Sequence, residues 1–421
     1  MRNDHDKMVK DIHEALVKCN AHDGMTVSFH HHFREGDLVV CMVMEEIHKM
    51  GIKNVTLSAS SLGKAHDALV PMIEDGTILN IESSGVRGKI GDAISHGKLK
   101  GLATMRSHGG RVRAIETGET HVDIAFIGAP SCDEYGNCTV HREIGPLDVT
   151  AMAQACKNSG GKVIVQVEKI VQGGSLDPKL VAIPGIYVDS VVVGTEEENM
   201  QCLGMPYDGA LTGEFRIPVD AIPPIPMDAK KIIARRAAME LPQDAIVNLG
   251  TGAPEKIANV AAEEGISDKM TLTVEAGSIA GVPYGGTQFG AAANAQCIIP
   301  HNVQFDFYQG GGLDVAFLGL AETAPNGDLN VSKFGTRLAG AGGFIDITQN
   351  AKKVVYCGTF TAKGLKTECK DGKLVITQEG AKKKFVKQVE HITFSGIYAN
   401  KVHQPVLYLS LIHISEPTRH S

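Results

Sequence analysis

The most constraining feature of this 421-residue chain is an internal repeat. Val122–Val140 contains VDIAFIG and GNCTV, and Leu313–Val331 contains LDVAFLG and GDLNV at the same spacing. The offset is 191 residues (313 minus 122), and it also carries Lys162–Val165 (KVIV) onto Lys353–Tyr356 (KVVY). Two independent matches at one offset are hard to obtain by chance, so we expect two domains that share one fold.

Both halves alternate strand and helix patterns. Gly24–Phe29 is typical of a strand, Leu38–Met50 has apolar residues at helical spacing, and Val55–Leu57 starts another strand. The pattern begins again with a strand at Ile246–Leu249 and a helix at Pro254–Glu264. Because βαβ order implies parallel strands, we predict an α/β fold made of two tandem, pseudo-repeated domains with largely parallel sheets.

The natural linker is Arg216–Met227, which has four prolines in twelve residues. Such a stretch forms neither a regular helix nor a central strand. We therefore expect an N-terminal α/β domain at residues 1–226 and a C-terminal α/β domain at residues 227–407.

Composition excludes several classes of function. The net charge of -7 leaves no basic stripe of the kind that nucleic acid binding needs. The nine cysteines never form a CxxC pair, which argues against a disulfide framework or a structural zinc site and for a reducing compartment. No run approaches the length of a membrane span, and the N-terminus has no apolar signal region. We expect a cytoplasmic protein whose partners are neither nucleic acid nor membrane.

Glu275 is the candidate reactive group. Thr271–Gly277 alternates polar and apolar residues as a strand does, which puts Glu275 at the carboxyl end of that strand, the edge where open α/β sheets bind ligands. Setting Leu57 on Leu272 places Ser60 opposite Glu275, so one half has a carboxylate where the other has a hydroxyl. A pair of this kind commonly has its active site in the cleft between the halves. The alternative is a strand-end carboxylate that is solvated or ion-paired.

A glutamate can act covalently on an activated acyl group such as a thioester, passing through an acyl-glutamyl anhydride to a glutamyl thioester. The oxyanion then needs backbone N–H donors, which glycine supplies where the main chain approaches closely. Each glycine run alone is more often a tight turn, but four runs after successive strands suggest a ligand edge. The candidates are Gly250 and Gly252, Gly285 and Gly286, Gly310–Gly312, and Gly340–Phe344 (which includes Gly342 and Gly343) with Asp346.

Several stretches in the later part of the chain carry a family resemblance: Lys157–Val163, Ile183–Asp189, Val247–Gly250, Leu272–Gly277, Gln304–Tyr308, Gly310–Asp314, Gly342–Asp346 and Cys357–Phe360. Through them, Lys157–Val406 resembles the single-chain family I CoA-transferases of the propionate/acetate type. The resemblance implies transfer of CoA from an acyl-CoA to a short carboxylate, with CoA as substrate and covalent intermediate and no permanently bound cofactor. It also implies a homo-oligomer, a glutamyl-CoA thioester on Glu275, and a thioester that lies at Gly342 and Gly343.

A different resemblance is carried by Ser28–Asp37, Ser83–Lys89, Ala93–Gly97 and Arg106–Arg111. Through these stretches, residues 1–130 resemble the alpha subunit of citrate lyase. That subunit is itself CoA-transferase-like and exchanges acyl groups on an acyl carrier protein. The alternatives to a CoA-transferase are therefore a citrate lyase alpha subunit that works with an acyl carrier protein, and a non-catalytic binding protein or chimera on the same fold.

His30, His31 and His32 raise the question of a metal. Neighbours in an extended segment point to opposite faces, so at most His30 and His32 could share an ion, and no third ligand is evident. We expect no metal, and a polar loop that contacts substrate or cofactor, or packs with Glu35. Arginines bind carboxylate or phosphate in fork geometry, although surface arginines are usually solvated. The candidates are Arg34, Arg106 and Arg111.

The last residues do not look like part of a fold. Leu409–Arg419 (LSLIHISEPTR) is similar to a translated adapter sequence used in DNA library preparation. We predict a non-native tail at residues 408–421 and a truncated C-terminal domain. The two family resemblances meet near Ile127–Asn137, which together with the tail suggests that the gene model joins two genes.

Overall fold

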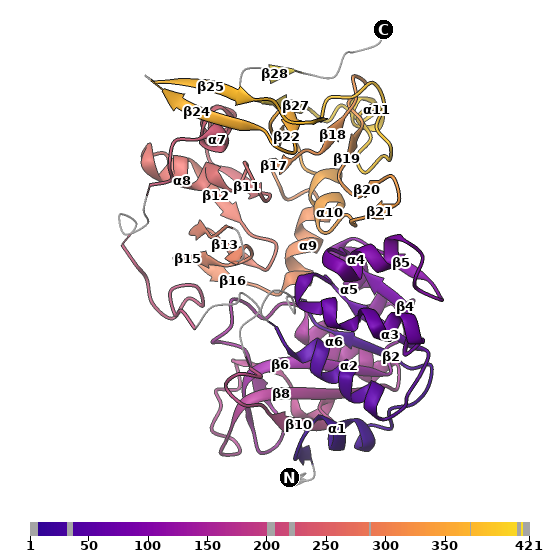
Figure 1. Ribbon diagram of the computed structural model, residues 1–421. Coiled ribbons are helices and arrows are strands. Elements are labelled where there is room, and N and C mark those ends of the chain that lie inside the picture. Colours follow the sequence, from indigo (N-terminus) through magenta and orange to yellow (C-terminus); the bar gives the residue numbers. More distant parts are fainter. Residues whose placement is uncertain are drawn as a thin grey trace. The chain divides into compact units, whose positions relative to one another are not determined.

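The computed structural model describes residues 7–31, 37–199, 207–218, 224–285, 288–370, 372–410 and 414–415. The chain forms two compact units (Figure 1). Unit 1 is Met1–Thr212 with Ile299–Asn302 and Thr336–Gly342, and unit 2 is Gly213–Ile298, Val303–Gly335 and Gly343–Ser421. The domain limits expected from the sequence stay a prediction, and part of the proline-rich linker and most of the C-terminal tail lie outside the described residues.

Unit 1 is built on one ten-stranded sheet. Eight strands run parallel in the order β1-β10-β8-β6-β2-β3-β4-β5, and β7 and β9 add antiparallel pairs. The ten strands of the sheet are β1 (Met8–Val9), β2 (Thr26–Phe29), β3 (Val55–Ala59), β4 (Ile78–Ser83), β5 (Ala103–Met105), β6 (Ile124–Asp133), β7 (Cys138–Thr139), β8 (Lys162–Val171), β9 (Val181–Ile183) and β10 (Ser190–Val193). Unit 1 also contains the short β21 (Arg337–Leu338), which is not part of this sheet. The helices are α1 (Ile12–Lys18), α2 (Val39–Lys49), α3 (Val70–Asp75), α4 (Gly88–Ser95), α5 (His108–Glu116) and α6 (Val149–Asn158).

Unit 2 has an eight-stranded sheet in the order β16-β13-β12-β11-β17-β22-β27-β28, in which the strands from β12 to β27 are parallel. Its strands are β11 (Ala245–Leu249), β12 (Met270–Thr273), β13 (Ser278–Ile279), β14 (Val282–Pro283), β15 (Ala292–Ala293), β16 (Cys297–Ile298), β17 (Val315–Gly319), β18 (Glu322–Thr323), β19 (Leu329–Asn330), β20 (Lys333–Phe334), β22 (Val354–Cys357), β23 (Thr361–Ala362), β24 (Lys366–Lys370), β25 (Lys373–Gln378), β26 (Lys382–Lys383), β27 (Val406–Leu409) and β28 (Ile414–Ser415). Its helices are α7 (Ala229–Ala238), α8 (Lys256–Glu263), α10 (Phe344–Gln349), α11 (Gly396–Lys401) and most of α9 (His301–Gln309), whose first two residues belong to unit 1. The predicted α/β fold with largely parallel sheets is confirmed.

The two sheets also repeat one pairing register. In unit 1, β2 lies between β3 and β6, and Val27 is opposite Leu57 on one side and Ile124 on the other. In unit 2, β11 lies between β12 and β17 in the same way. The residues that correspond there to Val27, Leu57 and Ile124 are Val247, Leu272 and Val315.

This register confirms the alignment expected from the sequence. Leu57 and Leu272 hold the same place in their sheets, and the neighbouring strands β6 and β17 are related by the offset of 191. Ser60 and Glu275 each lie three residues beyond that pair. They are therefore corresponding residues at the carboxyl ends of corresponding strands.

Each sheet is covered by apolar clusters on both faces. Phe126 joins one cluster of unit 1 while its neighbours Ala125 and Ile127 join the other, because successive strand residues point to opposite faces. In unit 2, Phe317 and its neighbour Leu318 divide in the same way. Sheets buried on both faces leave their strand ends as the accessible polar edge, where the sequence places the candidate residue Glu275.

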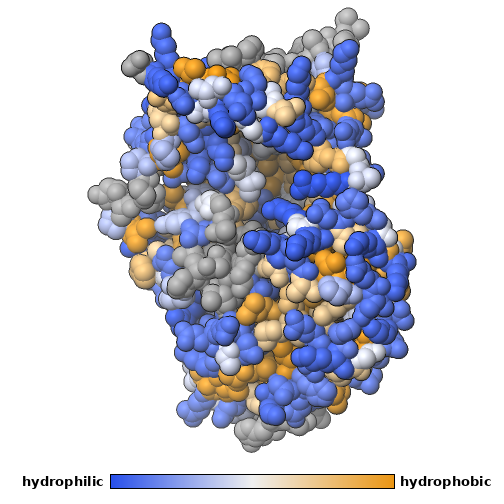
Figure 2. All heavy atoms as spheres, in the orientation of Figure 1, coloured by the Kyte–Doolittle hydropathy of each residue, from blue (hydrophilic) through white to orange (hydrophobic). Residues whose placement is uncertain are grey.

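Hydrophilic side chains cover much of the visible face in Figure 2, with exposed apolar residues in scattered groups. Single exposed apolar side chains are normal for a folded domain. Within the described part of the chain, no helix has the length and apolar character needed to cross a membrane.

Candidate active site

Glu275 lies in the tight turn that joins β12 to β13. The Val274 amide donates to the Ser278 carbonyl at 2.9 Å, and the Gly277 amide donates to the Val274 carbonyl at 2.9 Å. Gly277 has a φ of +114°, which residues with a Cβ rarely adopt, so this position of the turn needs glycine. Glu275 is half-buried at the end of its strand, where the sequence predicted it.

Gly343 brings main chain against the Glu275 carboxylate. A Cβ built on Gly343 would lie 2.5 Å from Glu275 Oε2 and 2.9 Å from Phe305 Cζ, distances that real Cβ atoms do not show. A Cβ at this position would therefore displace the Glu275 carboxylate or the Phe305 ring. Within the described residues the Gly343 amide has no hydrogen-bond partner, so this N–H is able to serve an oxyanion.

The other predicted glycines are placed differently. The Gly250 amide donates to the Phe317 carbonyl at 2.7 Å, and the Gly252 amide donates to Glu255 Oε2 at 3.2 Å, so both amides are engaged. A Cβ on Gly285 would lie 2.9 Å from the Glu255 carboxyl carbon. Gly252 and Gly285 thus meet at Glu255, and Gly286 lies outside the described residues.

The residues flanking Gly343 have other partners. Phe344 is buried, and its ring stacks on Tyr356 at a centroid distance of 5.8 Å, so it packs in the core. Asp346 accepts a hydrogen bond from Gln309 Nε2 at 2.6 Å. The Gly342 amide donates to the Ser84 carbonyl at 2.9 Å within unit 1, so this predicted donor is also engaged.

A buried hydrogen-bond network supports the end of β12. Thr273 Oγ1 donates to the Val247 carbonyl at 2.9 Å, and Tyr308 OH donates to Thr273 Oγ1 at 3.0 Å. The Tyr308 oxygen accepts from Gln304 Nε2 at 2.7 Å and from Asn248 Nδ2 at 3.2 Å. Burial, and to a smaller degree the Glu275 charge, raise the pKa of Tyr308, so its phenol stays protonated.

Sequence reasoning missed this network as a unit. Gln304 and Tyr308 are four residues apart and therefore share one face of α9, which is a readable signal. Their convergence with Asn248 and Thr273 depends on the pairing of β11 with β12, which no local pattern contains.

Unit 1 has a buried polar cluster at the corresponding edge. His31 Nδ1 is 2.8 Å from Ser60 Oγ, and His108 Nδ1 is 2.6 Å from Ser84 Oγ. The His31 ring stacks on His301 at a centroid distance of 4.1 Å and meets His108 edge-on at 4.7 Å. Sequence reasoning named His31 and Ser60 but did not pair them, since they follow different strands.

Desolvation favours the neutral form of two histidines at this edge, His30 and His301. Burial lowers the pKa of His30 and of His301 to about 4. His30 Nδ1 lies 2.6 Å from the His31 carbonyl, and among the described residues no group of three side chains is able to hold a metal. His32, Glu35 and Arg34 lie outside the described residues.

The two described arginine candidates have internal partners. Arg111 is fully buried, and its Nη2 donates to Ser28 Oγ at 2.8 Å and to the Phe29 carbonyl at 2.9 Å. Arg111 therefore stabilises the end of β2. The two interpretations made from the sequence, a ligand-binding arginine and a solvated surface arginine, are both wrong for Arg111 because its side chain is buried. Arg106 pairs with Glu82 at 3.3 Å and Glu119 at 3.0 Å.

The citrate lyase alpha subunit family matches residues 5–201. The citrate lyase alpha chain of Escherichia coli (strain K12) is 42% identical over 178 residues, which are 42% of this chain and 33% of that protein. The caffeate CoA-transferase of Acetobacterium woodii is 47% identical over 296 residues, or 69% of this chain and 56% of that protein.

Acetate CoA-transferase YdiF of Escherichia coli O157:H7 is 44% identical over 288 residues, or 68% of this chain and 54% of that protein. The chain thus spans little more than half the length of these curated transferases. The solved apoenzyme of YdiF aligns with a TM-score of 0.87 and 30% identity, over 100% of this chain and 89% of that one. A thioester complex of YdiF with CoA aligns with a TM-score of 0.85.

Proposed function

The chain belongs to the CoA-transferase family, and on that premise we propose that it moves CoA from a short acyl-CoA to a short carboxylate through Glu275. The observation that carries the proposal is the approach of the Gly343 main chain to the Glu275 carboxylate. The names of the relatives, which are acetate and caffeate CoA-transferases, support carboxylate substrates. We also propose a cytoplasmic homo-oligomer without a permanently bound cofactor.

The proposed reaction keeps the energy of the thioester. The Glu275 carboxylate attacks the acyl-CoA carbonyl, which releases CoA thiolate and leaves an acyl-glutamyl anhydride. The thiolate then attacks the glutamyl carbonyl, which releases the first carboxylate and forms a glutamyl-CoA thioester. The acceptor carboxylate reverses both steps and leaves with CoA, so no proton or electron is gained or lost.

Three features of unit 2 serve this chemistry. The Gly343 amide is able to donate to the oxyanion of each tetrahedral intermediate. The Tyr308 network holds Thr273 and therefore the strand end that carries Glu275. The Gly277 turn places Glu275 two residues beyond Thr273, the paired residue of β12.

The test is direct detection of the glutamyl thioester. The protein is incubated with acetyl-CoA and reduced with borohydride, which converts a thioester to an alcohol, and its peptides are analysed by mass spectrometry. We expect the peptide containing Glu275 to carry the reduced side chain, and Glu275→Ala to lose both the modification and CoA exchange. An unmodified Glu275 peptide in protein that still exchanges CoA would refute the covalent route.

The family match over residues 5–201 supports a second candidate, a citrate lyase alpha subunit that exchanges acyl groups on an acyl carrier protein. This candidate predicts transfer to an acyl carrier protein and tolerance of Glu275→Ala. Transfer to acetate and transfer to an acyl carrier protein are each measured with the unaltered protein and with Glu275→Ala. These measurements separate the two functions, because only the CoA-transferase proposal predicts that loss of Glu275 stops transfer to acetate.

A further inference from the structure

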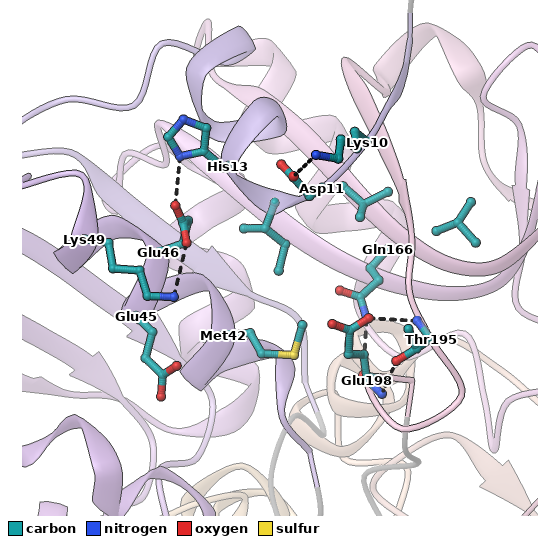
Figure 3. A pocket seen from close by; sticks show the side chains of 13 residues that line it. Lys10, Asp11, His13, Met42, Glu45, Glu46, Lys49, Gln166, Thr195 and Glu198 are labelled. Atoms are coloured by element: carbon teal, nitrogen blue, oxygen red, sulfur yellow. Dashed lines mark hydrogen bonds and ion pairs between the residues drawn. The ribbon is translucent and has the colours of Figure 1, made fainter.

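A polar pocket lies wholly within unit 1, away from any residue assigned above. Its volume is about 570 Å³, and α1, α2 and the strands β8 and β10 contribute to it. Figure 3 shows Met42, Glu45 and Glu46 of α2 on one side and Gln166, Thr195 and Glu198 on the other.

Gln166 presents a buried acceptor that lacks a donor. Its side chain is 3% exposed, and its Nε2 donates to Asn199 Oδ1 at 2.9 Å and to the Glu198 carbonyl at 3.2 Å. Among the described residues, Gln166 Oε1 has no hydrogen-bond partner. A buried carbonyl oxygen without a donor is costly, so the position favours a ligand that supplies an N–H.

The orientation of the Gln166 amide follows from its neighbours. Asn199 Nδ2 donates to the Gly194 carbonyl at 2.8 Å, so Asn199 Oδ1 must face Gln166 and accept from its nitrogen. The Gly194 main chain packs against this pair, because a Cβ there would lie 2.5 Å from Asn199 Oδ1 and 2.7 Å from Gln166 Nε2. The oxygen of Gln166 is therefore the atom left to the pocket.

The charge of the lining selects the ligand. Four carboxylates line the pocket against two lysines, Lys10 and Lys49. Both lysine side chains are largely exposed and already have partners, Asp11 at 3.9 Å and Glu46 at 3.5 Å. Glu45 is exposed on α2 and forms no ion pair with any described residue. The surplus of negative charge favours a cationic donor.

Apolar side chains line the same pocket. Ile12, Met42, Val192 and Val193 contribute to its wall, and Val193 is exposed although it is a strand residue. A ligand that combines a charged donor with a short hydrocarbon stem would cover these side chains.

We propose that this pocket binds a small aliphatic amine. The ammonium group donates a hydrogen bond to Gln166 Oε1 and faces the Glu45 carboxylate, and the hydrocarbon stem contacts Met42 and Val192. The site goes beyond CoA transfer, because it uses none of the residues assigned to that reaction.

The test uses 1,4-diaminobutane as the probe and the full-length chain. Methionine methyl NMR, with the Met42 signal assigned by Met42→Leu, reports binding at this pocket. We expect a saturable shift of the Met42 methyl signal with the amine and none with 1-butanol at equal concentration. Gln166→Leu should weaken binding about tenfold, and Glu45→Gln about threefold. Glu74→Gln, an exposed helical carboxylate outside the pocket, should leave it unchanged.

Two results would overturn the proposal. One is an equal Met42 response to 1-butanol, which would show an apolar surface without amine selectivity. The other is unchanged affinity in Glu45→Gln, a surface substitution that keeps the test valid even if Gln166→Leu does not fold. CoA exchange is not part of the readout, so failure of the transferase proposal does not affect this one.

Discussion

Ser60 and Glu275 hold the same register position in the two sheets, and their surroundings differ. Ser60 is 4% exposed and its hydroxyl lies 2.8 Å from His31 Nδ1, inside the polar cluster of unit 1. Glu275 is half-buried in a glycine turn, with the Gly343 main chain against its carboxylate. The repeat thus preserved the backbone position and not the side-chain surroundings, and this difference underlies the proposal that Glu275 reacts while Ser60 has a structural role.

The largest expected effect tests this division of roles. Glu275→Ala should reduce exchange of label between acetyl-CoA and acetate about a thousandfold or more, because it removes the proposed nucleophile. Ser60→Ala should keep the rate within about tenfold and cost about 1–3 kcal/mol of unfolding free energy, since His31 loses a buried partner. Equal losses of exchange in both variants would contradict the comparison.

The next effect concerns the approach of main chain to Glu275. Gly343→Ala places a methyl group 2.5 Å from the present position of Glu275 Oε2, so the carboxylate must move. Moving the carboxylate by about 1 Å should lower the exchange rate about a hundredfold. The control is Gly319→Ala, whose Cβ would meet only the Thr251 carbonyl at an ordinary 3.4 Å. Similar rates in the two variants would argue against a role for the Gly343 approach.

The third effect is a difference in acid stability between the units. Burial lowers the pKa of His30 and His301 to about 4, whereas an unfolded imidazole titrates near 6.5. Below pH 6.5 the unfolded chain therefore binds protons that the folded chain does not, so the unfolding free energy of unit 1 should fall as pH drops from 6.5 to 4. The loss is at most about 3 kcal/mol for each histidine. Hydrogen exchange of unit 1 peptides, corrected for intrinsic rates, measures it.

Unit 2 and Asp37 sharpen that measurement. Desolvation of Glu322 is outweighed by its hydrogen bonds with Lys382 and Asn330, and the pKa of this carboxyl is lowered. The contribution of Glu322 to the unfolding free energy of unit 2 is therefore lost only as pH falls below about 4.5. Burial raises the pKa of Asp37 to about 7, so its contribution to the unfolding free energy of unit 1 falls as pH rises from 4 to 7. This pH dependence is opposite in sign to that of the buried histidines. Asp37→Asn should therefore steepen the acid loss. Parallel acid profiles for the two units would contradict the assignment.

The smallest expected effect concerns the support beneath Glu275. Tyr308→Phe removes the oxygen that accepts from Gln304 and Asn248, which should cost about 1–3 kcal/mol of unfolding free energy. The exchange rate should fall less than in Gly343→Ala, because the Glu275 turn remains. Phe307→Leu, in the same helix but 39% exposed, is the control and should change stability less. A larger loss of unfolding free energy in Phe307→Leu than in Tyr308→Phe would contradict a stabilising role for the Tyr308 hydroxyl.

Strand-level features were readable from the sequence. The alternation at Thr271–Gly277 placed Glu275 at a strand end, and the repeat predicted that Leu57 corresponds to Leu272, which the two pairing registers confirm. The sequence did not predict which glycine amides are unbonded and could therefore donate to an oxyanion. Of the predicted glycine amides, those of Gly250 and Gly252 are engaged, and that of Gly343 has no partner among the described residues. A glycine-rich loop has the same composition whether its amides are bonded or open.

Period, spacing and composition are local, and they determined the α/β class, the repeat and the position of Glu275, because burial on both faces of a parallel sheet leaves its mark in consecutive residues. Only the tertiary structure decided that Arg111 is enclosed beneath β2, that His31 meets Ser60, and that Gly343 reaches the Glu275 carboxylate. Each of these contacts joins residues from different strands or loops, and its energy depends on the distance between chain segments that sequence spacing does not contain.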